Sequence, residues 1–162
     1  MPGYYALAVV VGVLAVIATW IFGLPVSADN NLQVWQAFIA WGCHFHSGGK
    51  FTGSRTAVVG MTFGAFIGMV AVMLAGQLGS LGTLAAPVAV GLGAFVICLA
   101  AAVPYLGVIP ASVYGFAAIA GLILLKGTPP EQALLPTFIS VLIGAIFGYV
   151  SEYITGAITK KA

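Results

Sequence analysis

Charged side chains are scarce in this chain of 162 residues: Asp, Glu, Lys and Arg together make up 5% of it. An average soluble domain contains about 25% charged residues. Hydrophobic residues make up 62% of the sequence. A soluble fold of this length cannot hide that much apolar surface, because it still exposes roughly a third of the area of its unfolded chain. The composition therefore predicts an integral membrane protein, with the lipid bilayer as its main partner.

Residues that perform catalysis or bind metals are also few. The two cysteines, Cys43 and Cys98, both lie in apolar segments, where a buried thiol acts as a small hydrophobic side chain. The two His and three acidic residues form no Ser-His-Asp or paired-carboxylate arrangement within an apolar run. We therefore predict no enzymatic activity, no metal site and no cofactor. A net charge of +2 gives no reason to expect a nucleic-acid partner.

The sequence contains several long apolar runs without charged residues. Several reach the length of about 18 residues that a helix needs to cross the hydrocarbon core of a bilayer. We predict an all-α membrane protein with one transmembrane domain over residues 1–162 and about six transmembrane helices, at 4–24, 32–47, 56–77, 83–104, 109–125 and 133–155. Segment 32–47 is one of the two shortest, so we expect it to be short, tilted or partly re-entrant.

The basic residues predict the orientation in the membrane. With six crossings, only Lys126 falls opposite the N-terminus, and four basic residues fall on its side: Lys50, Arg55, Lys160 and Lys161. The positive-inside rule then places both termini in the cytoplasm. Val26-Ser27-Ala28 resembles a signal-peptidase site, but no basic residue precedes the long apolar run before it. We therefore expect 4–24 to be a retained helix.

The chain also contains a candidate internal repeat. At an offset of 80 residues, Gly60, Gly64 and Gly68 match Ser140, Gly144 and Gly148. At an offset of 79, Val34-Trp35 and Gly42 match Val113-Tyr114 and Gly121. A sequence rich in Gly and Ala also produces such matches by chance. A true duplication divides the chain into repeats at about 4–77 and 81–156, each with three crossings. The prediction is therefore two inverted three-helix repeats, as in many channels and transporters.

The matching small residues have two interpretations. Each run places them four residues apart, so they share one face of a helix. Such a face lets another helix backbone approach closely, and we interpret it first as a packing surface. The alternative is a smooth wall that lines a narrow path for a small solute. The two interpretations are compatible.

The most polar stretch of the sequence, residues 41–56, begins at the end of segment 32–47. It holds both histidines, two of the five basic residues and a glycine pair, and the second repeat has no counterpart. His44 and His46 point in different directions on a helix, and no further ligands accompany them at metal-site spacing. We hypothesise that this stretch forms the cytoplasmic-side constriction of a solute path, built by Trp41, His44, His46, Ser47, Gly48 and Gly49. The alternative is an ordinary helix end whose histidines lie among lipid headgroups.

Charged residues near the segment ends are expected to meet water. Glu152 is close to the end of the last apolar segment, where we expect it to reach the interface or to pair with Lys160 or Lys161. A role in proton coupling is the alternative. Lys50 and Arg55 are expected to act as cytoplasmic anchors.

Several of these motifs resemble those of a known family. They are Trp35-x-x-Phe38, Gly42-Cys43 followed by Phe45 and Gly48-Gly49, and Leu135-Pro136 leading to Gly144-x-Ile-Phe-Gly148-Tyr149. With Pro110 before the fifth segment, they resemble the YcdZ-like bacterial inner-membrane proteins over most of the chain. The resemblance implies a small multi-pass protein of the bacterial inner membrane, of unknown function. His44 and His46 are not part of the family pattern.

The sequence favours a simple transport device. Pumps and coupled transporters usually bury several ionisable residues, whereas a passive channel needs only a lined path and a constriction. We predict a passive channel or facilitator for a small neutral or weakly charged solute. The alternatives are a secondary transporter with alternating access and a non-transporting adaptor subunit of a larger complex. Because thin helices leave little room for a path within one protomer, we expect a closed homo-oligomer.

Overall fold

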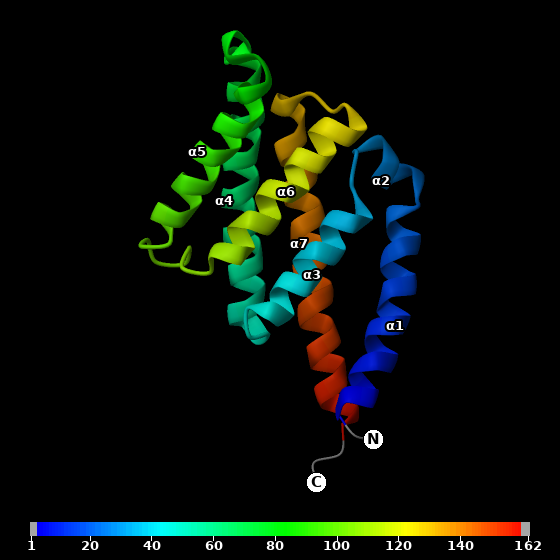
Figure 1. Ribbon diagram of the computed structural model, residues 1–162. Helices are drawn as coiled ribbons and strands as arrows, with labels where there is room; N and C mark the ends of the chain where they lie inside the picture. Colours follow the sequence, from blue (N-terminus) through cyan, green and yellow to red (C-terminus); the bar gives the residue numbers. More distant parts are fainter. Residues whose placement is uncertain (1–2, 160–162) are drawn as a thin grey trace.

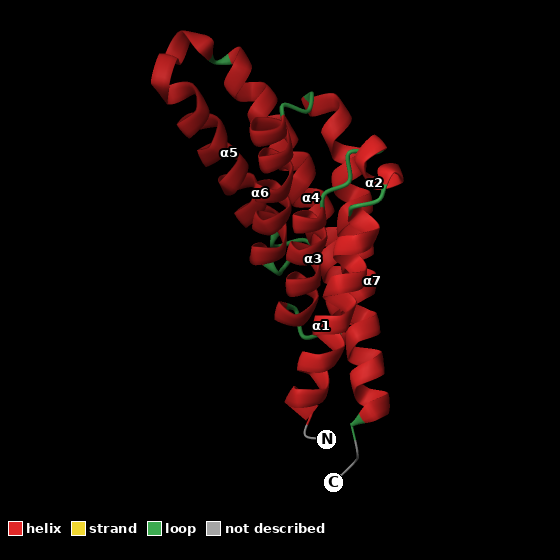
Figure 2. Ribbon diagram, turned by 90° about the vertical axis from the view of Figure 1, so that its right-hand side faces the viewer, coloured by secondary structure: helices red, strands yellow, loops and turns green. Residues whose placement is uncertain are grey.

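The computed structural model of the chain describes residues 3–159, and the secondary structure within this range is entirely helical. It consists of seven α-helices and one short 3-10 helix, η1 (Figures 1 and 2). Their bounds are α1 Gly3–Phe22, α2 Pro25–Asp29, α3 Val34–His46, α4 Lys50–Gln77, η1 Gly79–Leu84, α5 Ala85–Ala100, α6 Ile109–Lys126 and α7 Pro130–Ile158.

Five helical segments are long and apolar enough to cross a membrane: α1, α4, η1 with α5, α6 and α7. The remaining expected segment, 32–47, corresponds to α3, whose 13 residues span about 20 Å. This is less than the hydrocarbon core, which is about 30 Å thick. Five of the six predicted segments are therefore long and apolar enough to cross a membrane, the sixth crossing is not shown, and the expectation that 32–47 is short is confirmed.

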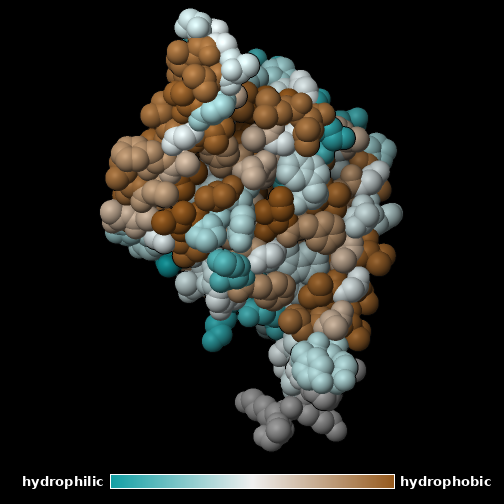
Figure 3. Space-filling model, viewed as in Figure 1, coloured by the Kyte–Doolittle hydropathy of each residue, from teal (hydrophilic) through white to brown (hydrophobic). Residues whose placement is uncertain are grey.

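The outer surface supports a membrane location. Hydrophobic residues cover much of the face seen in Figure 3, and hydrophilic residues gather in patches between and below them. Large apolar side chains such as Val16, Trp20 and Leu125 are exposed. Contiguous apolar surface of this extent is not stable in water and marks contact with lipid or another protein. The chain is a membrane protein with several transmembrane helices.

Proline and glycine set the ends of the last two helices. Pro110 and Pro130 lie in the first turns of α6 and α7, where their missing N–H groups would have no partner within the helix. Gly127 ends α6 in the left-handed conformation, with φ of 68°. The turn residues that separate the predicted segments therefore also fix where these helices begin and end.

The helices are arranged around two long central ones, α4 and α7, which contact each other. α6 packs against α4, and α3 packs against α7; α5 flanks α4, and α1 flanks α7. In Figure 1, α3 and α6 run obliquely across the central helices, and the ends of α1 and α7 meet at the bottom. Gly3 and Thr159 are close neighbours there.

Glycines bring these helices into backbone contact. A Cβ atom at Gly64 of α4 would overlap the backbone of Ser112 in α6, and one at Gly115 would overlap the backbone of Met61. Gly144 of α7 lies in the same way against Ala37 of α3. The two small-residue faces expected from the sequence therefore lie in helix contacts: Gly60, Gly64 and Gly68 against α6, and Ser140, Gly144 and Gly148 against α3.

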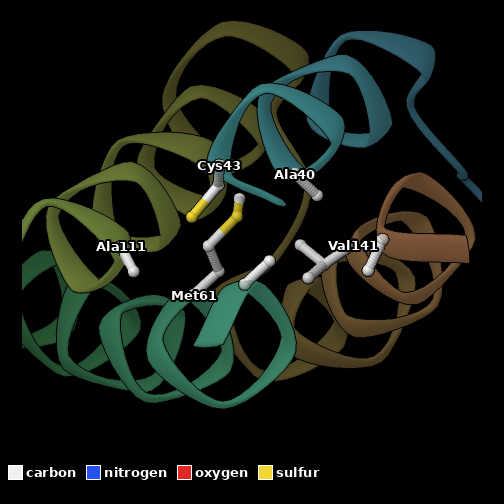
Figure 4. Packing of buried hydrophobic residues seen from close by; sticks show 7 residues of the cluster. Ala40, Cys43, Met61, Ala111 and Val141 are labelled. Atoms are coloured by element: carbon white, nitrogen blue, oxygen red, sulfur yellow. The ribbon is translucent and has the colours of Figure 1, made fainter. Parts of the chain in front are cut away.

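Apolar side chains fill the space where α3, α4, α6 and α7 meet. Cys43, Met61, Ala111 and Val141 point toward one another in Figure 4, and all four are fully or almost fully buried. A second buried cluster, around Ile119 and Leu122, lies toward the other end of α6. The centre of a single protomer is therefore closed in this conformation.

Candidate functional site

The contact between α3 and α7 has polar contacts toward both of its ends, on either side of an apolar middle. Four hydrogen bonds or close polar contacts cross it: Gln33 N to Ser140 Oγ at 3.0 Å, Gln36 Nε2 to Thr137 Oγ1 at 3.1 Å, Trp41 Nε1 to Ser151 Oγ at 3.1 Å, and His44 Nε2 with Glu152 Oε2 at 3.1 Å. We call these eight residues the polar seam. Its members are mostly buried, where an unbonded polar group is costly in a bilayer, and all but one of their buried side-chain polar atoms have a partner; the exception within the described residues is Gln36 Oε1.

The contact between α4 and α6 is different. Gly60, Gly64 and Gly68 lie directly against Ala111, Ser112 and Phe116, and we call these six residues the glycine seam. Within residues 3–159, no side-chain hydrogen bond joins α4 to α6. Close apolar packing of this kind holds two helices in a fixed relation. The chain therefore pairs one tight, apolar helix contact with one polar helix contact.

Three helices meet at His44, which is completely buried. Its Nδ1 is 2.9 Å from Ser54 Oγ of α4, and its Nε2 is 3.1 Å from Glu152 Oε2 of α7. Ser54 Oγ is also 3.3 Å from the carbonyl oxygen of Ala145, and the Glu152 carboxylate accepts the backbone N–H of Lys50. We call His44, Ser54, Glu152 and the Lys50 N–H the junction.

The turn from α3 to α4 has an unusual backbone. Gly48, Gly49 and Lys50 all have positive φ, at 91°, 67° and 54°. A non-glycine residue rarely adopts such a conformation. A Cβ atom at Gly49 would overlap the Glu152 carboxylate, and Gly148 leaves the space that the His44 ring fills. Glycine is therefore needed here both for the turn and for the approach of the carboxylate.

The structure divides the six residues expected to form a constriction. Trp41, His44 and Gly49 are buried on the side of α7, whereas Gly48 is exposed and Ser47 is half-buried beside Cys43. His46 is exposed on the other side of α3, and its ring packs edge-on against Tyr114 of α6, with centroids 6.0 Å apart. The two histidines thus point in different directions, as their spacing predicts, and His46 does not join the junction.

Sequence reasoning missed most of the polar seam. Gln33 and Gln36 were not singled out, although they share one helix face with His44 at spacings of 3 and 8 residues. Thr137 and Ser151 were also missed, and Ser140 was assigned to helix packing alone. Polar residues recurring on one face of an apolar segment are the signal that finds them.

Glu152 has partners that were not expected. It contacts His44 and the backbone of Lys50, while Lys160 and Lys161, its expected partners, lie outside the described residues. Its side chain is 35% exposed and lines a surface pocket of about 440 Å³ between α4 and α7. The buried ring of His44 is therefore connected to the outside through this carboxylate. Within residues 3–159, no group of three His, Cys, Asp or Glu residues is placed to hold a metal ion.

A family model described as "Protein of unknown function (DUF1097)" matches residues 8–156. The chain belongs to the DUF1097 family. No curated protein and no solved structure matches it. The match covers all seven α-helices almost completely, so polar seam and glycine seam both lie within the family domain. It names no YcdZ-like family and assigns no activity to DUF1097.

Proposed function

We propose that this DUF1097 protein is a passive channel or facilitator for a small neutral or weakly charged solute, and that the solute path follows the polar seam. The observation that carries the proposal is the row of hydrogen-bonding side chains between α3 and α7, extending from Gln33 to Glu152. Buried polar groups in a membrane are costly, and they commonly mark a solute path. A polar solute exchanges its hydration for such groups as it crosses.

The helix contacts support an architecture of two inverted repeats. α4 packs on α6 as α7 packs on α3, and α5 flanks α4 as α1 flanks α7. The equivalent glycines have equivalent neighbours. In α4, Gly64 lies against Ser112 and Gly68 against Ile119. In α7, Gly144 lies against Ala37 and Gly148 against His44. These contacts make Ala37 equivalent to Ser112 and His44 equivalent to Ile119, so α3 matches α6 at an offset of 75 residues. The sequence matches favour an offset of 79, which differs by about one helical turn.

Under this pairing the junction has no polar counterpart. Ile119 stands where His44 would be, and Val72 stands where Glu152 would be. Both belong to an apolar cluster or pack against it. Two halves of similar architecture therefore differ in the polarity of one helix contact, which supports a specific role for the polar seam.

The remaining features of the proposal concern assembly and location. Because the centre of the protomer is filled, conduction requires α3 to shift along α7 while the close packing of the glycine seam keeps α4 and α6 together. We also propose that the protein assembles into a closed homo-oligomer. The ends of α1 and α7 lie at the same end of the bundle, which supports termini on one side of the membrane. We assign them to the cytoplasm of a bacterium on the positive-inside rule.

A secondary transporter with alternating access is the second candidate. The contact between the buried His44 ring and the partly exposed Glu152 carboxylate favours it, because His and Glu within membrane helices commonly form proton relays in coupled transporters.

Flux into proteoliposomes tests the proposal. We expect faster entry of at least one solute among urea, short amides, polyols, weak acids and ammonium than in protein-free liposomes. Passive flux follows the solute gradient alone, whereas a transporter also responds to an imposed pH gradient. If no solute enters faster and the purified protein holds a partner at fixed stoichiometry, the facilitator proposal is wrong and the adaptor remains.

A further inference from the structure

Three surface hollows follow one another along the contact between α4 and α7. The first is the pocket of about 440 Å³ beside Glu152, and it shares Phe51 and Tyr149 with a second hollow of about 340 Å³. The second shares Val58 and Val59 with a third, of about 540 Å³. Residues of α4 and α7 line all three. They therefore form one continuous groove, which we call the α4–α7 groove.

The length of this groove matches that of a lipid chain. It extends from Phe51 to Phe66 on α4 and from Tyr149 back to Leu134 on α7. At 1.5 Å per residue, each of these stretches is about 22 Å long. One leaflet contributes about 15 Å, half of the hydrocarbon core. Large apolar side chains in the groove, such as Phe51, Phe66 and Ile146, are exposed, so a hydrocarbon chain is the favourable filling.

The two ends of the groove differ in charge. Lys50 and Arg55 line it at the end where α4 begins, and both are exposed. The other end is lined by apolar side chains and Thr62. The guanidinium of Arg55 lies over the ring of Tyr105, with Cζ 4.5 Å from the ring centroid. A stacked guanidinium still presents N–H groups at its edge, where a phosphate can accept them.

The carboxylate of Glu152 lines the same end and has partners within the protein. It accepts the backbone N–H of Lys50 and lies 3.1 Å from His44 Nε2. Two basic side chains against one carboxylate leave this end of the groove positive. Tyr149 and Tyr153 line it as well, and tyrosine is enriched at the level of the lipid headgroups.

Two other apolar hollows on the surface lack this combination. One lies between α3 and α6, around Cys43 and His46, and the other lies on α1, around Val16 and Trp20. Neither has a Lys or Arg among its described lining residues. Such surfaces contact the acyl chains of any lipid. A positive end therefore distinguishes the α4–α7 groove from them.

We propose that the α4–α7 groove binds one anionic membrane phospholipid, with an acyl chain along its apolar length and the phosphate beside Lys50 and Arg55. The bound lipid packs against both central helices and stabilises their contact, as any ligand of the folded state does. The proposal concerns the outer surface of the protein, and it holds whether or not the protein conducts a solute.

Native mass spectrometry of the protein, freed of lipid in mild detergent, tests the proposal. Phosphatidylglycerol and phosphatidylcholine with the same acyl chains are titrated separately, and the dissociation constants of the first bound lipid are compared. A basic residue near an anionic headgroup contributes about fivefold in affinity. We therefore expect phosphatidylglycerol to bind roughly 5- to 25-fold more tightly than phosphatidylcholine, because two basic residues are present.

Charge variants assign this preference to the end of the groove. Arg55→Gln should reduce the preference about fivefold, whereas Arg55→Lys keeps the charge and should retain most of it. Lys126→Gln removes a positive charge at the opposite end of the bundle and should leave the preference unchanged.

Variants of the apolar lining test the position of the chain. Val59→Trp fills the groove and should abolish the preference for phosphatidylglycerol. Val90→Trp makes the same change on the exposed surface of α5 and should have no effect. A phosphatidylglycerol with a diazirine in the middle of its chain locates the lipid without any substitution. We expect it to crosslink to residues 58–66 and 134–146.

Four results would overturn the proposal. They are equal affinity for the two lipids in the parent protein, a preference that survives when Lys50→Gln and Arg55→Gln are combined, displacement of phosphatidylglycerol by an equal concentration of inorganic phosphate, and crosslinks confined to other helices. Displacement by phosphate would show that the headgroup alone is recognised and that the groove holds no chain.

Discussion

Gly49 occupies the position on which the junction depends most directly, because the space of its missing side chain holds the Glu152 carboxylate. Its neighbour Gly48 has a similar positive φ but open space around it. Replacing Gly49 with Ala therefore adds an overlap to the backbone strain, whereas replacing Gly48 adds strain alone. Gly48 is exposed, and its place in a constriction stays a prediction.

At Gly49 we expect Gly49→Ala to lower the free energy of unfolding by more than about 1 kcal/mol, and by more than Gly48→Ala does. Thermal unfolding of both variants in the same detergent measures the difference. Equal losses in the two variants would show that backbone conformation alone matters at this turn.

His44 and His46 form a natural pair for comparison. His44→Ala leaves Ser54 without its histidine partner and opens a cavity, so we expect a loss of about 1–3 kcal/mol in stability. His46 is exposed, so His46→Ala should change stability by less than about 0.5 kcal/mol. Unfolding monitored by circular dichroism compares the two. A larger loss from His46→Ala would contradict the placement of the two rings.

At the scale of helices, α4 contains glycines in opposite environments. Gly64 lies against the Ser112 backbone, whereas Gly76 has nothing within 4 Å of its ideal Cβ position. We expect Gly64→Ala to separate α4 from α6 and to cost about 1–3 kcal/mol. Gly76→Ala should be neutral or stabilising by up to about 1 kcal/mol, because alanine favours helix. Melting temperatures of the two variants give the comparison, and similar values would exclude the glycine seam as a rigid contact.

The polar seam predicts which helix contact controls flux. Thr137→Val keeps the shape of the side chain but removes the hydroxyl that Gln36 contacts. If the solute path follows the seam, we expect flux to change by roughly fivefold, the factor given by one hydrogen bond of about 1 kcal/mol. Thr62→Val makes the same change on α4, in a groove away from the seam. Equal flux in Thr137→Val, Thr62→Val and the parent would place the path elsewhere.

For the whole molecule, the prediction is one of topology. The ends of α1 and α7 lie together, and the α6–α7 turn lies at the opposite end of the bundle (Figure 1). A cytoplasmic reporter fused after residue 162 should be active, and the same reporter inserted at Gly127–Thr128 should be silent. The reverse pattern would invert the orientation that the basic residues predict.

Hydropathy predicts the membrane-crossing part of each helix better than its ends. Segment 56–77 was expected, but α4 begins at Lys50, because polar residues such as Thr52 and Arg55 continue the helix beyond the apolar run. Likewise α7 extends beyond 133–155 at both ends. The junction was not predictable in this way, since His44 and Glu152 are 108 residues apart in sequence. Their meeting depends on how the helices pack.

The closeness of Gly3 and Thr159 has a consequence for connectivity. Because the ends of α1 and α7 meet, a short linker can join them without displacing either helix. The chain can then be reopened at η1, between α4 and α5, at the opposite end of the bundle. Such a circular permutant keeps every helix contact described above but begins and ends on the other side of the membrane. It would also place the two three-helix halves in reversed order along the chain, α5–α7 before α1–α4.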